Sequence, residues 1–104
     1  MDTLARLEDT VIRRLTADPG SSYVASLQAR GLPVIARKLG EEAVEAIVAA
    51  LSGSEEELVG EAADVLFHLT VLLAAKGVPL ARVMAELERR EGTSGLEEKA
   101  SRSS

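Results

Sequence analysis

The sequence has 104 residues, a formal net charge of −5 and 46% hydrophobic residues. This length suits one small domain with its own core, and the acidic balance argues against a general nucleic-acid-binding protein, which would need a basic face. Because the chain contains no cysteine, a disulfide framework and thiolate chemistry are excluded, in agreement with a reducing compartment.

The composition predicts helices rather than sheets. Tyr23 and Phe67 are the only aromatic residues, so the core must consist of Leu, Val, Ile and Ala, while Glu and Arg are abundant helix formers. The charged, amphipathic first ten residues are unlike a signal peptide, and we expect no apolar run long enough to span a bilayer. The sequence therefore predicts a single all-α domain over residues 1–104 in the cytoplasm, with neither a membrane nor a nucleic acid as partner.

Two helices are expected in the N-terminal third of the chain. In residues 1–17, leucine, valine and isoleucine recur at helical spacing, and Asp18-Pro19-Gly20 ends this first helix. Ser22 offers an N-cap for a second, short helix that begins at Tyr23 and is ended by Gly31.

A third helix is expected from about Pro33 to about Leu51. Pro33 lies just inside its start, where the missing N–H is not needed. Gly40 lies in its middle, at a cost of about 1 kcal/mol relative to alanine. Such a glycine indicates that a neighbouring helix or a ligand approaches the backbone closely, and we favour the neighbouring helix.

A fourth helix is expected from about Glu55 to Lys76. Ser54 and Glu57 form a capping box at its start. Its second half is apolar nearly all round, and such a helix must be buried on several sides, which so small a domain can hardly provide alone. We therefore expect a homodimer, with residues 67–73 contributing to a shared helical core.

The chain closes with a fifth helix and a polar tail. Gly77 ends the fourth helix, and Pro79 starts the fifth, which runs to about Glu91. Residues 92–104 are polar and contain glycine and serine, so we expect a mobile tail. The predicted fold is an all-α bundle of about five helices, in which the third and fourth are central and antiparallel.

Five carboxylates lie on the two central helices. At 100° per residue, Glu41, Glu42 and Glu45 fall within one narrow arc of the third helix, and Glu61 and Asp64 lie one turn apart on the fourth. If the helices pack antiparallel, the two groups face each other, and carboxylates at close range repel strongly where water is scarce. A divalent cation would make this cluster tolerable, and hard oxygen ligands suit Mg²⁺ best.

These acidic groups have the forms Glu-Glu-x-x-Glu and Glu-x-x-Asp on consecutive helices, which resembles the all-α NTP pyrophosphohydrolases of the MazG-like superfamily. Their flanks look more specifically like the phosphoribosyl-ATP pyrophosphohydrolase family, over nearly the whole chain. The chain departs from that pattern at Pro33-Val34, where family members often carry charged residues, and this argues against a basic substrate contact there. The matching segments are Ser22-Tyr23, Lys38-Leu39-Gly40-Glu41-Glu42, residues 61–69, residues 86–90 and residues 94–100.

The resemblance implies hydrolysis of phosphoribosyl-ATP between its α and β phosphates. The products would be phosphoribosyl-AMP and pyrophosphate, as in the second step of histidine biosynthesis. The resemblance also implies that Glu42, Glu45, Glu61 and Asp64 bind Mg²⁺, which would bridge the protein and the phosphate oxygens. Glu41, with Glu42, is a candidate for orienting and deprotonating the attacking water, although the sequence leaves open which of the five carboxylates is the base.

Several basic residues have more than one interpretation. Lys38 shares a strip of the third helix with the glutamates, and either pairs with them or binds a phosphate of the substrate. His68 lies one turn from Asp64, where a lone histidine beside an apolar stripe is more often a hydrogen-bonded packing residue than a catalytic one. Four cations near the C-terminus either close over the phosphates or only improve solubility: Arg89, Arg90, Lys99 and Arg102.

Two other functions remain as alternatives. A housekeeping nucleotide pyrophosphohydrolase of the same fold would act on canonical or damaged (d)NTPs, and the matches outside the acidic motifs argue against it. A non-enzymatic helical dimerisation module would carry its acids as a solvated helix face. Such a module would show neither stabilisation by Mg²⁺ nor release of pyrophosphate.

Overall fold

The computed structural model describes residues 2–92, 95, 99–100 and 102, and within these residues every long regular element is a helix. The prediction of an all-α fold is therefore confirmed, and each predicted helix end lies within two residues of the observed one. The predicted polar tail lies largely outside the described residues. The helices are α1 (Thr3–Leu15), α2 (Tyr23–Arg30), α3 (Leu32–Ser52), α4 (Glu55–Ala75) and α5 (Leu80–Glu91).

Capping residues in the sequence set the helix ends. Gly77, just after α4, has φ of +69°, and the N–H of Val78 donates to the carbonyl oxygen of Leu73 at 2.9 Å. This Schellman arrangement satisfies a carbonyl at the end of α4 and turns the chain toward α5. At the starts of α1, α2 and α4, an N-cap side chain accepts a hydrogen bond from a backbone N–H three residues on, and these N-caps are Asp2, Ser22 and Ser54.

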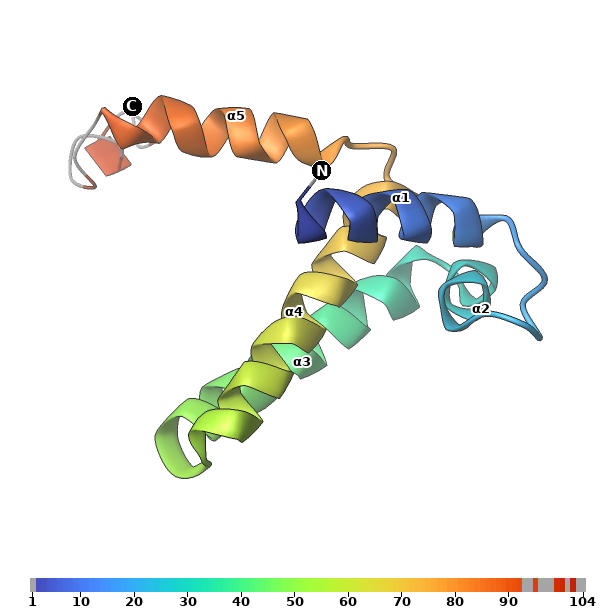
Figure 1. Ribbon diagram of the computed structural model, residues 1–104, viewed down its shortest axis with the longest axis horizontal. Coiled ribbons are helices and arrows are strands. Elements are labelled where there is room, and N and C mark those ends of the chain that lie inside the picture. The colour runs from blue at the N-terminus through green and yellow to red at the C-terminus, as the bar shows by residue number, and fades with distance from the viewer. Residues whose placement is uncertain (1, 93–94, 96–98, 101, 103–104) are drawn as a thin grey trace.

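An antiparallel hairpin of α3 and α4 is the longest feature of the molecule (Figure 1). Only Gly53 and Ser54 connect the two helices. A Cβ atom at Gly53 would lie 3.0 Å from the carbonyl oxygen of Ala49, so this short connection depends on glycine. The tight turn brings the acidic stretches of the two helices alongside each other.

The hydrophobic core lies at one end of the hairpin, where α1 and α2 pack against it (Figure 1). It is aliphatic, as the composition predicts, and Phe67 packs on its edge. Two buried polar side chains, His68 and Thr70, accompany it on α4. The buried residues of the core cluster come from four helices and are Val11, Val24, Leu27, Ile35 and Val71.

The other end of the hairpin exposes large apolar side chains. We call this surface the hairpin face. Within residues 67–73, which the sequence predicts to contribute to a shared dimer core, His68, Thr70 and Val71 are buried inside this chain. The apolar surface that is open to a partner lies instead on the outer part of the hairpin. Its exposed fractions run from 55% to 83%, and its members are Val44, Ile47, Val48 and Leu51 on α3 and Val59 on α4.

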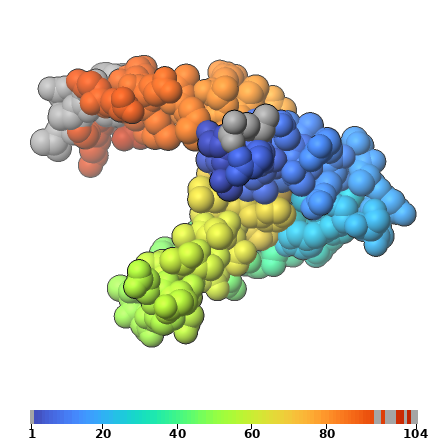
Figure 2. All heavy atoms as spheres, viewed as in Figure 1, coloured from blue at the N-terminus to red at the C-terminus, as the bar shows by residue number. Residues whose placement is uncertain are grey.

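The single chain has an open shape. Figure 2 shows α5 extending from the body on one side and the hairpin extending on another, with a wide notch between them. The radius of gyration is 15.8 Å, whereas a compact domain of this length has about 13 Å. The start of α5 is anchored to α1, since the N–H of Leu80 donates to Oε2 of Glu8 at 2.7 Å.

Two further expectations from the sequence need correction. By length and composition α4 is apolar enough to cross a membrane, with a mean hydropathy of 1.7, although core helices of soluble proteins meet the same criterion. At Gly40, a Cβ atom would meet nothing within 4 Å in the described part of the chain. The expected close packing of a neighbouring helix on Gly40 is therefore wrong for the single chain.

Candidate metal centre between α3 and α4

The predicted acidic cluster forms on the facing sides of α3 and α4. Glu42 and Glu45 are close to one turn apart on α3, and the antiparallel hairpin brings Glu61 of α4 opposite them. Each of the three offers one carboxylate oxygen within 4.8 Å of the other two. The structure thus brings together three of the four residues that the sequence predicts as metal ligands.

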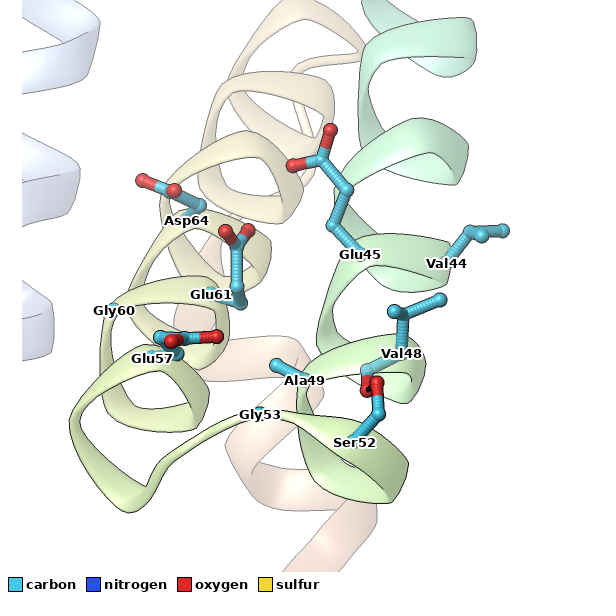
Figure 3. Close-up of a pocket in the computed structure, with 10 residues that line it drawn as sticks. All are labelled: Val44, Glu45, Val48, Ala49, Ser52, Gly53, Glu57, Gly60, Glu61 and Asp64. Carbon is cyan, nitrogen blue, oxygen red and sulfur yellow. Dashed lines mark hydrogen bonds between the residues drawn. The ribbon is translucent and has the colours of Figure 1, made fainter.

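Asp64, the fourth predicted ligand, lies beside this set rather than in it. Its side chain is exposed, and it lines the same hollow of about 470 Å³ as Glu45 and Glu61. Figure 3 shows Glu45 reaching from α3 toward α4, where Glu61 and Asp64 follow one another along the helix. Rotation of the short Asp64 side chain changes the distance from its carboxylate to the three clustered glutamate carboxylates.

The clustered carboxylates perturb one another. Burial raises the pKa of Glu42 above its ordinary value, and the adjacent carboxylates of Glu45 and Asp64 raise it further, while His68 opposes them. Burial likewise raises the pKa of Glu61, followed by the effects of Glu45, Glu42 and Asp64. In both residues Oε2 is buried with no hydrogen-bond partner among the described residues. Since buried polar atoms are nearly always paired, these two oxygens lack the partner that such atoms normally have within the described part of the chain.

A divalent cation fits this donor set. All the available atoms are carboxylate oxygens, the hard ligands that Mg²⁺ and similar ions prefer. A cation would give the unpartnered oxygens of Glu42 and Glu61 a ligand to bind, and it would favour their ionised forms. Desolvated, mutually repelling carboxylates in a hollow are also typical of functional sites.

Glu41 lies outside the cluster. Its carboxylate pairs with Nε of Arg37 at 3.4 Å and with Nζ of Lys38 at 3.4 Å. The hydrogen bond that Lys38 donates to Glu41 is also the main cause that raises the pKa of Lys38. The structure therefore shows the ion pair, one of the two interpretations of Lys38, and in it Glu41 holds the Lys38 ammonium beside the cluster.

His68 is a hydrogen-bonded packing residue, as predicted. Its side chain is buried, with Nδ1 2.8 Å from the carbonyl oxygen of Asp64 and Nε2 3.0 Å from the hydroxyl of Tyr23. The ring of Tyr23 stacks on Phe67 with centroids 6.1 Å apart. The sequence did not assign a role to Tyr23, and its only signal was the match of Ser22-Tyr23 to the family pattern.

Two arginines of α5, Arg89 and Arg90, form ion pairs within their own helix. Arg89 and Arg90 approach Glu86 at 2.6 Å and 3.6 Å, and the hydrogen bond from Arg89 lowers the pKa of Glu86. Lys99 and Arg102 belong to the tail, of which the structure describes only part. In the single chain the pairs of Arg89 and Arg90 are thus local to α5, which extends away from the body (Figure 1).

Comparison with known proteins points to the same chemistry. The model of a family described as phosphoribosyl-ATP pyrophosphohydrolase matches residues 4–91. The chain is 65% identical to the phosphoribosyl-ATP pyrophosphatase of Erythrobacter litoralis over 102 residues, which cover 98% of both chains. It is 63% identical to the protein of that name from Novosphingobium aromaticivorans, over 98% of this chain and 95% of that one, and 63% identical to that of Rhizorhabdus wittichii, over 96% and 94%. The chain therefore belongs to the phosphoribosyl-ATP pyrophosphohydrolase family.

Proposed function

We propose that this protein hydrolyses phosphoribosyl-ATP to phosphoribosyl-AMP and pyrophosphate, the second step of histidine biosynthesis, as a soluble enzyme of the cytoplasm. One observation carries the proposal. The family match includes both acidic motifs, and three of their carboxylates meet in a set in which one oxygen of Glu42 and one of Glu61 are buried with no hydrogen-bond partner among the described residues. A solvated helix face would leave those oxygens in water, whereas here they are buried.

Mg²⁺ is the cofactor we propose, with Glu42, Glu45, Glu61 and Asp64 as its ligands. When bound, the ion neutralises the substrate's phosphate oxygens and polarises the phosphorus that water attacks. The chain supplies the positioning, because two packed helices fix Glu42, Glu45 and Glu61 within a few ångströms of one another. Asp64 supplies an exposed carboxylate at the mouth of the same hollow.

Glu42 is better placed than Glu41 to orient the attacking water. Glu42 lies inside the cluster and has a buried oxygen without a partner, so it can accept a proton from a water held there. Glu41 is already paired with Arg37 and Lys38. We assign Glu41 the task of holding the Lys38 ammonium beside the site, where it can meet a phosphate.

We also propose that the protein is a homodimer. Large exposed apolar surface is unusual on a monomer, and the hairpin face exposes five large apolar side chains, from Val44 to Val59. The open space beside Gly40, on the same helix, leaves room for a second copy to approach α3. Burying two hairpin faces against each other would give a compact bundle from two open chains.

The proposed reaction is tested by measuring phosphate products from phosphoribosyl-ATP, with ATP and dUTP as control substrates. We expect release of pyrophosphate, not orthophosphate, that requires Mg²⁺ and is fastest with phosphoribosyl-ATP. Equal or faster turnover of the plain nucleotides would favour the housekeeping enzyme. No pyrophosphate from any of the three, together with no stabilisation by Mg²⁺, would favour the dimerisation module.

A further inference from the structure

The two aromatic residues and the single histidine of the chain gather beside the proposed metal centre. Tyr23 comes from α2, and Phe67 and His68 come from α4. The His68 ring meets both aromatic rings edge-on, with centroids 5.9 Å from Tyr23 and 5.2 Å from Phe67. His68 is 5% exposed but Tyr23 is 49% exposed, so the cluster presents mainly Tyr23 to its surroundings.

The His68 ring is held in one tautomer. The carbonyl oxygen of Asp64 can only accept a hydrogen bond, so Nδ1 of His68, 2.8 Å away, carries the ring proton. In the neutral ring Nε2 is then an acceptor, and the Tyr23 hydroxyl, 3.0 Å away, must donate to it. When His68 is neutral, the hydrogen bonds therefore run in one direction, from Tyr23 through His68 to the backbone beside the proposed metal centre.

This direction decides what the Tyr23 hydroxyl can bind on its exposed side. Its proton is already given to His68, so its oxygen has only lone pairs to offer. Donation to His68 also makes that oxygen a stronger acceptor. Ionised phosphate oxygens are acceptors themselves and do not suit it. An O–H or N–H group does.

We propose that Tyr23 is a substrate-contact residue that recognises the nucleoside part of the substrate through a hydrogen-bond donor, either a sugar hydroxyl or a base N–H. His68 is the positioning residue that fixes the polarity of the Tyr23 hydroxyl. The inference rests on the proposed function, because it takes phosphoribosyl-ATP as the substrate.

The location of the Tyr23, Phe67 and His68 rings supports a contact of Tyr23 with the nucleoside rather than with the phosphates. His68 follows Asp64 by one helical turn and bonds to its backbone, so the Tyr23 hydroxyl borders the end of the acidic cluster. Phosphates held by the cation and Lys38 would leave the nucleoside to emerge at such a border. The half-exposed ring of Tyr23, backed by Phe67, also offers an apolar surface to a sugar or base.

Single substitutions test the contact. Tyr23→Phe removes the oxygen but keeps the ring on Phe67, and should raise the KM for phosphoribosyl-ATP about threefold to tenfold, with kcat within about twofold, as for one neutral hydrogen bond. Ser21→Ala removes an exposed hydroxyl that bonds to the carbonyl oxygen of Asp18 just before α2; it is the matched control and should leave the KM unchanged. An unchanged KM in Tyr23→Phe overturns the proposal.

Replacements of His68 test its positioning role. His68→Gln places an amide oxygen that can still accept from Tyr23, so its KM should stay within about twofold of wild type. His68→Leu removes the acceptor and should raise the KM as Tyr23→Phe does. Tyr23→Phe and His68→Leu together should raise the KM no further than either alone, because both act through the Tyr23 hydroxyl oxygen. Additive effects of the two changes would contradict that role.

The two reaction products distinguish the nucleoside from the phosphates. Phosphoribosyl-AMP carries the nucleoside, and pyrophosphate does not. Tyr23→Phe should weaken inhibition by phosphoribosyl-AMP about threefold to tenfold and leave inhibition by pyrophosphate unchanged. Equal weakening of both overturns the proposal, because that result means that Tyr23 acts on the phosphates, for example by holding Lys38.

Binding without turnover separates this inference from the proposed function. Tyr23 is the only tyrosine and the chain has no tryptophan, so its fluorescence reports on this one ring. With Mg²⁺ present, phosphoribosyl-AMP should change the emission of the wild type, and pyrophosphate should not. If that holds in a protein that releases no pyrophosphate from phosphoribosyl-ATP, the proposed reaction fails and the nucleoside contact stands. If turnover is normal but neither product changes the emission, the contact fails and the reaction stands.

Discussion

At the residue scale, Glu42 and Glu61 differ from the other acids of the hairpin. Glu55, Glu56 and Glu57 lie in the first turn of α4, where negative charge suits the helix dipole, and all three are exposed. Glu42 and Glu61 each bury an oxygen without a partner and have a raised pKa. The first group has a sufficient structural explanation, whereas the buried oxygens of the second are the ones that the proposed cation would bind.

Removing one carboxylate from the cluster should separate stability from activity. Asp64→Asn relieves repulsion on Glu42 and Glu61, so in EDTA we expect a Tm equal to or slightly above that of wild type, the usual trade between stability and function. Mg²⁺ should raise the Tm of wild type more than that of the variant. Pyrophosphate release should fall at least about 100-fold, since even outer-shell changes at metal sites cost about 10- to 100-fold.

Asp9→Asn is the matched control for that variant. Asp9 is exposed on α1, so its neutralisation should leave activity and the response to Mg²⁺ unchanged. Equal Mg²⁺ responses in wild type, Asp64→Asn and Asp9→Asn would mean that Asp64 belongs to a solvated face.

The raised pKa of Glu61 predicts a pH dependence for the metal-free protein. Below the ordinary pKa of 4.5, the carboxyl is protonated in both the folded and the unfolded chain and has no effect. As pH rises from there to the raised folded-state pKa, the unfolded chain loses its proton first, so the free energy of unfolding falls. Glu61→Gln removes this loss of stability. In EDTA, the Tm of the variant should therefore exceed that of wild type only at a pH above the ordinary pKa of 4.5. A difference that stays constant with pH would contradict the assignment.

The acidic motifs could be predicted from the sequence because helical spacing alone places Glu42 with Glu45, and the short connection fixes the antiparallel partner. The position of the Glu41 carboxylate could not be predicted, since the direction of this side chain depends on its ion pairs with Arg37 and Lys38. The bond between Tyr23 and His68 joins residues 45 positions apart, and no local pattern reports such a contact. Sequence spacing therefore predicts the centre of the site better than its border.

At the scale of elements, the α3–α4 hairpin is the scaffold of the site. Its helix ends were predictable because capping chemistry is local, as Ser54 at the start of α4 shows. The environment of Gly40 was not predictable. A mid-helix glycine indicates only that some group approaches the backbone, and no described residue of this chain approaches a Cβ at Gly40 within 4 Å. Which helices bury the second half of α4 was likewise not predictable, since an apolar surface does not identify the helix that packs on it.

Gly53 should prove essential to the hairpin connection. In Gly53→Ala the new Cβ would press on the backbone of Ala49, at 3.0 Å from its carbonyl oxygen, and we expect a loss of about 1 to 3 kcal/mol of stability. Gly92→Ala is the control, because a Cβ there would meet no atom of the described residues within 4 Å. Urea melts of both variants in EDTA measure the effect, and equal stabilities would contradict the steric account.

At the scale of the whole molecule, the single chain leaves too much apolar surface uncovered. Its core cluster is confined to the end of the hairpin near α1 and α2, while the hairpin face and α5 extend away from it (Figure 2). The sequence predicts a homodimer from the same shortage of burial, with residues 67–73 in its shared core. In the single chain, His68, Thr70 and Val71 of that segment are already buried, because α1 and α2 pack at this end of the hairpin.

A charge in the hairpin face should break the proposed dimer. Ile47 is 59% exposed and does not line the acidic hollow, so Ile47→Glu should convert a dimer into monomer at micromolar concentration, as measured by sedimentation velocity. Ile12→Glu is the matched control, because Ile12 is 51% exposed on α1. A wild type that sediments as a monomer would contradict the homodimer, and equal effects of the two variants would contradict this choice of interface.

Product analysis of wild type and Glu45→Gln tests the central claim most directly, that carboxylates from two helices hold a cation for the release of pyrophosphate. Glu45 lies next to both Glu42 and Glu61, and Glu88→Gln on exposed α5 serves as the matched control. With phosphoribosyl-ATP and Mg²⁺, ³¹P NMR should show equal amounts of pyrophosphate and phosphoribosyl-AMP from wild type and Glu88→Gln, and almost none from Glu45→Gln or from wild type in EDTA. Orthophosphate as the product, or turnover that survives both EDTA and Glu45→Gln, would contradict the account.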